Sequence, residues 1–505
     1  MNWEGDGLHI HQEHVDRYEW VYTAGMVFSA VLVVLGFLLA SPREIWEGLI
    51  RIITVQDVLI TDYFVIAGPG AAIVNAALVN AIALNVIRFS GDPCNGFTIV
   101  EIGLMTGFSL FGKNFVNIWP IMVGTWLYAK YQKEPFSKYS SVAVMATALA
   151  PMVSYMALGS AFASIPLGIV TGLIIGFIIP TLSAYTYKIQ NGMNLYNMGF
   201  ACGLLALMVI PMLTALGDKP ETVLYWGEGY NLLFGCLLAA FCLALIGIGF
   251  FTKHPVWAVW AGYRRLITTT GRSPSDYLRM FGGCPTLVNM GINGLIATGY
   301  ILITGGQLNG PTIGGILVVM GFSAVGKHAL NILPVMVGIG LCAALVHGDI
   351  AKPALQIAAL FGTGLAPIAG HFGWVYGIVA GFIHASLVMQ TGSPVGGVNL
   401  YNNGFSAGLI VIVMYPAITA IVRHRRITVR DEDYYDLFEE DAPIDISQWR
   451  THGEDNPHVV EERERLHHIH HAHQPESVLE TEDGNQETVE DPAEDMEDFN
   501  KMDLD

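Results

Sequence analysis

Long apolar runs separated by short polar breaks extend over most of the chain. The first set lies near 18–40, 63–87, 114–131, 139–158, 161–186 and 195–216, and the second near 231–252, 285–304, 329–347, 351–370, 374–390 and 398–422. A helix needs about 20 apolar residues to cross the hydrocarbon core of a bilayer. The pattern therefore predicts an all-α polytopic membrane protein with about 12 transmembrane helices.

Two further apolar runs, 96–112 and 310–326, are shorter and are interrupted by glycine. In lipid, every backbone polar group must be satisfied within the spanning segment, so an irregular run is tolerated only where it packs inside protein or lines a watery cavity. We therefore predict two broken or re-entrant segments that meet near the centre of the molecule.

These two runs belong to an internal repeat. Residues 95–124 and 309–338 align without a gap and are identical at 16 of 30 positions. The repeat continues in "NLYNMGF" at 194–200 and "NLYNNGF" at 399–405. We infer two tandem homologous repeats, 18–216 and 231–422, joined by a linker at 217–230. Duplicated membrane folds commonly place a substrate path between their repeats.

Composition supports the membrane class, since 52% of residues are hydrophobic and 13% are charged, against about a quarter charged in soluble domains. Residues 1–17 form a polar N-terminal segment, and no cleavable signal peptide is expected there. Residues 427–505 hold 26 of the 43 acids but only 5 of the 25 bases. This composition predicts an acidic, disordered tail. Nothing in the chain indicates nucleic-acid binding.

Basic residues flank many of the apolar runs and bear on orientation. An outside N-terminus with re-entrant broken segments would make the two halves parallel and place these bases in the cytoplasm: Arg43, Arg51, Lys130, Lys133, Lys138, Lys188, Lys253, Arg264, Arg265, Arg272, Arg279 and Lys352. We favour this arrangement, although "RHRR" at 423–426 should also be cytoplasmic and opposes it. If the broken segments cross fully, the halves are inverted.

Lys113 and Lys327 occupy matched positions in the two broken segments. A lysine deep in a bilayer costs roughly 3 kcal/mol, so it snorkels to the headgroups, pairs with another group or faces a cavity. Two cations facing a central path would favour an anionic solute or a substrate carboxylate. Glu101 lies in the first segment only, opposite Gly315 in the second. Three roles are open to it: neutralising a lysine, titrating in a proton-coupled step, or lying at the mouth of the path.

Asparagines also recur at matched positions, and we count them with Lys113, Lys327 and Glu101 as candidate path residues. Those at 194 and 197, and those at 399 and 402, are spaced i, i+3 and would share one face of a helix. Their amides would contact a polar solute or join neighbouring helices. The pairs are Asn95 and Asn309, Asn117 and Asn331, Asn194 and Asn399, and Asn197 and Asn402.

The tail contains the run "HHIHHAH" at 467–473. His467 and His471 are spaced i, i+4, and His468 and His471 are spaced i, i+3, so a short helix would present them to a transition metal. The alternative is a solvated acidic tail that binds metals only adventitiously. We expect no cofactor.

The doubled "NG-x-T-I…GFS…GK…N-I-x-P" and "NLYN-x-GF" motifs resemble those of an uncharacterised family of prokaryotic multispanning membrane proteins with a duplicated core. The resemblance covers roughly residues 20–425 and implies no substrate. In layout alone, the duplicated halves also resemble urea- and ammonium-channel architectures, a likeness that carries no substrate across.

The sequence is best interpreted as a multi-pass plasma-membrane transporter or channel for a small polar solute, with the path between the repeats. A divalent-metal transporter with chelating His-rich tails is the second hypothesis. The third is a membrane assembly factor or a membrane-embedded enzyme. An enzyme is not expected, because no GxSxG, HExxH or GxxxxGK[ST] motif is present. Homo-oligomer formation is left open.

Overall fold

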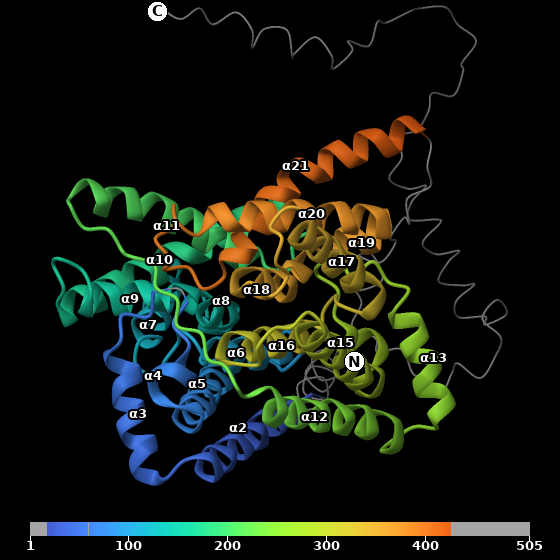
Figure 1. Ribbon diagram of the computed structural model, residues 1–505, viewed down its shortest axis with the longest axis horizontal. Helices are drawn as coiled ribbons and strands as arrows, with labels where there is room; N and C mark the ends of the chain where they lie inside the picture. The colour runs from blue at the N-terminus through green and yellow to red at the C-terminus, as the bar shows by residue number, and fades with distance from the viewer. Residues whose placement is uncertain (1–17, 59, 426–505) are drawn as a thin grey trace, which may run out of the picture. The chain divides into compact units, whose positions relative to one another are not determined.

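Residues 18–58 and 60–425 are described by a computed structural model of the protein (Figure 1). Within these ranges the regular elements are helices, and one isolated bridge joins Thr61 to Tyr225.

Helices of the first half follow the order predicted by the apolar runs. They are α2 (Glu19–Leu39), α3 (Pro42–Thr54), α4 (Tyr63–Ala67), α5 (Pro69–Ser90), α6 (Gly96–Phe108), α7 (Trp119–Gln132), η1 (Phe136–Lys138), α8 (Ser140–Ala146), η2 (Thr147–Leu149), α9 (Ala150–Leu158), α10 (Ile165–Gln190) and α11 (Asn197–Ala215).

The second half repeats this order, apart from η1. Its helices are α12 (Asn231–Phe251), α13 (Val256–Leu266), α14 (Tyr277–Phe281), α15 (Gly283–Ile303), α16 (Gly310–Phe322), α17 (Ala329–Leu345), α18 (Pro353–Phe361), η3 (Gly362–Leu365), α19 (Ala366–Phe372), α20 (Trp374–Thr391) and α21 (Asn402–Arg425).

Ten helical rods in the described ranges are long and apolar enough to cross a membrane, where about 12 were expected. They are α2, α5, the run α8–α9, α10, α11, α12, α15, the run α18–α19, α20 and α21. The expected spans near 114–131 and 329–347 correspond to the shorter helices α7 and α17, of 14 and 17 residues. The predicted broken segments correspond to α6 and α16, of 13 residues each.

Both short helices α6 and α16 begin and end at sequence features that the halves share. Asn95 and Asn309 are their N-caps, and each side-chain oxygen accepts a hydrogen bond from the first turn. Beyond each helix the chain turns and reaches a glycine with positive φ, Gly112 at 144° and Gly326 at 134°. That conformation is readily adopted only by glycine. The repeated "NG" and "GK" letters therefore mark the two ends of one short helix.

Within each half, the broken helix runs antiparallel to the span before it. Asn75, near the start of α5, donates to the carbonyls of Ser109 and Lys113, just beyond the end of α6, at 2.7 and 2.9 Å. Asn289 of α15 makes the matching bonds beyond the end of α16.

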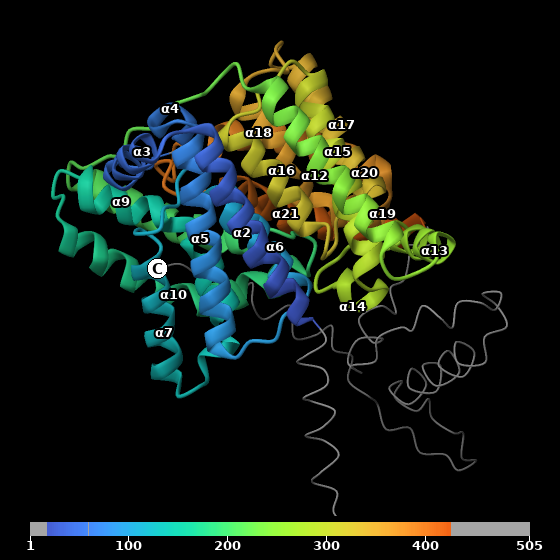
Figure 2. The ribbon, with the colours of Figure 1, turned by 90° about the horizontal axis from the view of Figure 1, so that it is seen from below.

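Between the halves, α6 and α16 also run antiparallel. Gly107 of α6 lies against Gly314 of α16, and Gly103 lies against Gly321, so the backbones touch along both helices. Since α5 is antiparallel to α6, α6 to α16, and α16 to α15, the spans α5 and α15 point in opposite directions. Figure 2 shows the consequence, with α3 and α13 at opposite ends of the bundle.

The parallel arrangement favoured from the basic residues is therefore wrong. Each broken helix adds one further pass through the bundle instead of turning back, so the chain enters the second half from the opposite end. Arg43 and Arg51 of α3 consequently lie at the other end of the bundle from Arg264 and Arg265 of α13. The argument from basic residues placed these two arginine clusters on the same side of the membrane, whereas the fold places them at opposite ends of the bundle.

Two aspartates cap the broken helix of the opposite half. Asp62 accepts from the Gly310 backbone N–H at the start of α16, at 3.2 Å. Asp276 accepts from the Gly96 backbone N–H at the start of α6, at 3.0 Å. A carboxylate at a helix N-terminus is favourable because unpaired N–H groups and the positive end of the helix dipole meet there. These caps, together with one buried apolar cluster that includes residues of both repeats, join the two halves.

Candidate functional site

Lys113 and Lys327 are fully buried between the halves. The Lys113 Nζ donates to the hydroxyl of Tyr401, in the other half, at 2.7 Å. The Lys327 Nζ donates to the Tyr196 hydroxyl and, at 2.8 Å, to the Thr363 Oγ1. In the described part of the chain, no ion pair includes either lysine. Hydroxyl groups and aromatic faces hold both ammonium groups, without a carboxylate.

Five aromatic side chains pack together against these lysines, and we call them the aromatic layer: Phe108, Tyr196, Phe322, Phe361 and Tyr401. Phe108 contacts Tyr401 and Phe361 with ring centroids 4.5 and 5.1 Å apart, and Tyr196 contacts Phe322 at 4.7 Å. Each lysine lies over rings of the layer at centroid distances of 4.4–5.6 Å. Such cation–π contacts compensate part of the cost of burying a cation.

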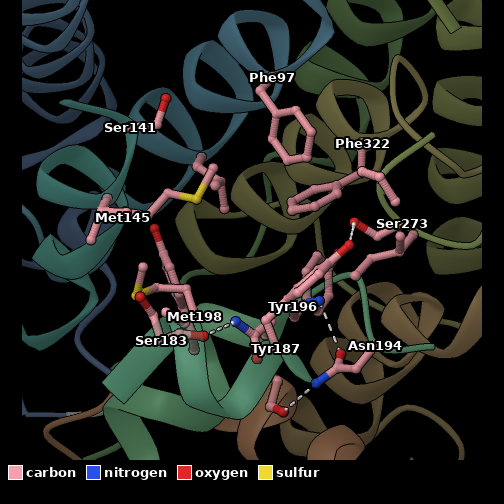
Figure 3. A pocket seen from close by; sticks show the side chains of 18 of the residues that line it. Phe97, Ser141, Met145, Ser183, Tyr187, Asn194, Tyr196, Met198, Ser273 and Phe322 are labelled. Atoms are coloured by element: carbon pink, nitrogen blue, oxygen red, sulfur yellow. Dashed lines mark hydrogen bonds between the residues drawn. The ribbon is translucent and has the colours of Figure 1, made fainter. Parts of the chain in front are cut away.

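A cavity of about 680 Å³ lies against the aromatic layer (Figure 3). All five rings of the layer line it, whereas neither buried lysine does. Its wall is largely apolar, with hydroxyl and amide groups interspersed. Among the described residues that line it, two are lysines, Lys138 and Lys188, and none is acidic. At its exposed rim, the Tyr187 hydroxyl lies 3.4 Å from the Ser273 hydroxyl.

The inner part of the cavity lies on the axis that relates the two halves. Residues at matched repeat positions line it together, so neither half forms this part alone. The pairs are Leu104 and Val318, Phe108 and Phe322, Met145 and Phe361, Tyr196 and Tyr401, and Met198 and Asn403.

The outer part of the cavity is formed mainly by α8 and α10 of the first half. Ser141 and Val142 are half-buried there, whereas their counterparts in α18, Ile357 and Ala358, are buried at 7% and 0% exposure. The two halves therefore differ: the cavity opens beside the first half, and the corresponding surface of the second half is packed.

A non-helical segment accounts for part of this difference. α10 has 26 residues, whereas its counterpart α20 has 18. The chain beyond α20 is non-helical at 392–398, and we call these residues the closing segment. Val395 and Val398 of this segment are fully buried, and Gly396 lies close to Ile210 of the first half and to Pro220 of the linker.

Four of the candidate asparagines organise the broken segments. Asn95 and Asn309 are helix caps, as described above. Asn117 donates to the Gly112 carbonyl at 3.1 Å, and Asn331 donates to the Gly326 carbonyl at 2.8 Å. These amides hold the turns that position the lysines and do not line the cavity.

The other four asparagines lie beyond the C-terminal ends of α10 and α20. Asn194 donates to the Gly404 carbonyl at 3.1 Å, and Asn399 donates to the Gly199 carbonyl at 3.2 Å, so the two bonds link α11 and α21 reciprocally. The expected shared helix face is wrong, because α11 begins at Asn197 and α21 begins at Asn402, leaving the first asparagine of each pair in the preceding turn. Asn194 and Asn197 line the cavity.

Glu101 lies within α6 at 1% exposure, and neither of its carboxylate oxygens has a hydrogen-bond partner among the described residues. It lies beside Ser141 of α8, which lines the cavity. An unpartnered buried carboxyl group is costly, and Glu101 is one of several buried polar groups near the site without a hydrogen-bond partner among the described residues.

Asp57, in the loop between α3 and α4, is a buried carboxylate that the sequence did not single out. It has positive φ (58°), where the second half has Gly271. Burial raises the pKa of Asp57 to about 7, although four hydrogen bonds oppose that shift. The donors are Tyr63, Ser154, Asn117 and Asn114, at 2.5–3.3 Å. Asp57 thereby ties the turn after α6 to the α3–α4 loop.

The sequence also missed the role of Tyr196 and Tyr401 as lysine partners, although both lie inside the repeated "NLYN" motif. Thr363 and Phe361 carried no recognisable signal. The described ranges contain no cluster of three or more His, Cys, Asp or Glu side chains that could hold a metal. The proposed metal ligands His467, His468 and His471 lie outside the described residues.

The fold and the cavity together define a multi-pass helical membrane protein made of two homologous halves. The chain belongs to the family described as "Protein of unknown function (DUF1576)", which matches twice, at residues 41–215 and 255–420. The two matches confirm the expected membership of an uncharacterised family with a duplicated core. Comparisons with curated proteins and with solved structures found no match.

Proposed function

We propose that the protein transports a small polar solute across the plasma membrane, along a path between its two repeats. The observation that carries this proposal is the cavity: matched residues of both halves line its inner part, and it is open beside one half only. Antiparallel repeats around a central site are the arrangement found in many secondary transporters.

Alternating access is the mechanism that this asymmetry supports. In the present conformation α8 and α10 leave the cavity open, and the closing segment packs over the opposite approach. Exchange of the packing between the two halves would close the first approach and open the second, with the aromatic layer between them. The lysines would stabilise an anionic solute from behind that layer.

Orientation follows from the basic residues at the open end. Lys138 and Lys188 line the cavity there, and Arg272 donates to the Asn191 carbonyl beside them at 2.7 Å. Since basic loops favour the cytoplasm, we infer that the cavity faces the cytoplasm. Glu19 at the start of α2 pairs with Arg88 at the end of α5 at 3.0 Å, so the chain enters α2 from the same side.

A flux screen in proteoliposomes tests transport directly. The panel contains small organic anions, inorganic phosphate, neutral polar solutes and divalent metals, and protein-free liposomes are the control. Saturable uptake of an anionic or polar solute supports the proposal. Selective uptake of a divalent metal would favour the second hypothesis, and a well-inserted protein that moves none of these classes would contradict transport.

A further inference from the structure

The cavity has chemical features that narrow the substrate class, and the inference drawn from them rests on the proposed transport function. The first is its apolar body. Phe97, Leu104, Val142, Met145 and Val318 line it beside the aromatic layer. Its volume of about 680 Å³ falls in the range of sites that enclose small organic molecules. A fully hydrated inorganic ion would leave most of this wall without a partner.

The second feature is a hydrogen-bond donor at the aromatic layer. The Tyr401 hydroxyl oxygen accepts a hydrogen bond from the Lys113 ammonium group. Among the described residues, no group accepts a hydrogen bond from the Tyr401 hydroxyl proton. Tyr401 is only 7% exposed and lines the cavity. A buried donor without an acceptor is costly, and a ligand oxygen would satisfy it.

The third feature is charge. Two buried ammonium groups lie behind the layer, two further lysines line the cavity, and no acidic residue lines it among the described residues. A buried charge without a counter-ion is unfavourable, and an anion at the layer would compensate it. Because an ammonium donates to the phenol oxygen, the phenol proton becomes a stronger donor toward such an anion.

We propose that this cavity binds an organic monocarboxylate with an apolar body. The carboxylate accepts the hydrogen bond of the Tyr401 hydroxyl, with Lys113 behind it, and the body packs against Leu104, Met145 and Val318. Tyr196 and Lys327 repeat this arrangement on the other side of the axis, so the opposite-facing conformation offers an equivalent site.

Binding to the full-length protein in nanodiscs tests the class without requiring transport. The probe is 3-phenylpropionate, compared by calorimetry with its neutral amide, with propionate, with succinate and with inorganic phosphate. We expect saturable binding of 3-phenylpropionate and binding at least ~10-fold weaker for the amide, which lacks the charge. Propionate should also bind at least ~10-fold more weakly, since it lacks the apolar ring.

Tyr401→Phe keeps the ring and removes the hydroxyl, so it should weaken 3-phenylpropionate binding by roughly 10-fold and leave binding of the amide nearly unchanged. Tyr131→Phe, at an exposed position outside the cavity, is the control and should change neither. Equal binding of acid and amide by the wild-type protein, tighter binding of phosphate or succinate, or no binding of 3-phenylpropionate would each overturn the proposal. Binding without flux in proteoliposomes would contradict transport and leave the substrate class standing. Flux of other solutes without carboxylate binding would contradict the substrate class and leave the transport function standing.

Discussion

Lys113 and Lys327 differ from most buried charges, because each is held by a hydroxyl group from the other half and not by an acid. Removing such a charge should cost the fold little, since burial of an unpaired ammonium is itself unfavourable. Their retention in both repeats is therefore better explained by what they contact in a loaded site than by stability.

Replacing both lysines tests this interpretation. Lys113→Met combined with Lys327→Met preserves side-chain volume and removes both charges, so we expect flux of an anionic solute to fall at least ~10-fold. The unfolding temperature in detergent should stay within a few degrees of the wild-type value, because a desolvation cost is removed. Uptake into proteoliposomes and thermal unfolding are the two measurements.

The matched arginine variants and an exposed control complete that experiment. Lys→Arg at both positions should retain part of the flux, because the charge survives while its geometry changes. Lys130→Met, at an exposed position, should have no effect. Undiminished flux in the double methionine variant would remove the lysines from the transport mechanism.

Sequence alone located the lysines but not their partners. Local signals sufficed for the first task, since an isolated lysine beside a glycine in an apolar run stands out in both repeats. The partners Tyr401 and Tyr196 are 288 and 131 residues away along the chain, and no local pattern specifies such a contact. Asn194 and Asn399 were misplaced for a related reason. The i, i+3 argument assumed that each lies within a helix, whereas α11 and α21 begin three residues further along, at Asn197 and Asn402.

The antiparallel pair α6 and α16 depends on glycine at its contact points. A Cβ added to Gly107 would lie 2.5 Å from the Gly314 carbonyl oxygen, closer than side chains approach in proteins. Small residues let membrane helices bring their backbones together in this way. The glycines that make these segments appear broken in the sequence are therefore the contact surface of the core.

Gly107→Ala should destabilise the protein by about 1–3 kcal/mol through overpacking. Gly299→Ala in α15 is the matched control, because a Cβ there meets no atom within 4 Å, and it should be neutral or slightly stabilising through better helix propensity. Thermal unfolding of both variants in the same detergent measures the difference. Equal stability of the two variants would show that α6 and α16 do not pack closely.

The closing segment is predicted to open during transport. Val395 is fully buried, so in a background without native cysteines, Val395→Cys should react with an external membrane-impermeant maleimide only when the second approach opens. We expect labelling to change at least ~2-fold when a transported solute is added, as the populations of the two conformations shift.

Ala297→Cys provides the control for that labelling. This residue is equally buried but lies within α15, away from the closing segment, and it should remain unlabelled. If the thiol of the Val395→Cys variant stayed unreactive in an actively transporting preparation, the solute would not pass the closing segment.

At the level of the whole molecule, the repeats themselves were evident from the sequence, and their relative direction was not. Identity between two segments reports common local structure, and it is equally high for parallel and antiparallel halves. The direction is decided by whether α6 traverses the bundle, which depends on its contacts with α16. Basic residues were the only directional signal, and the clusters at 43–51 and 264–279 were both assigned to the cytoplasm, although the fold places them at opposite ends of the bundle.

Antiparallel halves make a direct topological prediction. Lys133 and Asp349, both exposed, lie beyond α7 and beyond its counterpart α17, and each is replaced by a single cysteine. If the basic end is cytoplasmic, an impermeant maleimide applied to intact cells should label the Asp349→Cys variant. The same reagent should label the Lys133→Cys variant only after permeabilisation. Labelling of both variants from the same side would refute the antiparallel arrangement.

The exchanged caps Asp62 and Asp276 have a consequence for biosynthesis. Asp276 follows Gly96, the residue that it caps, by 180 positions, which at 5–20 residues per second is roughly 10–40 s of translation. During that interval the nascent first half has an uncapped α6 and a bare glycine surface within the membrane. A ribosome that stalled in the linker would release a half-protein able to pair with the second half of another copy. Membrane quality control would have to hold or degrade that species until its own partner was made.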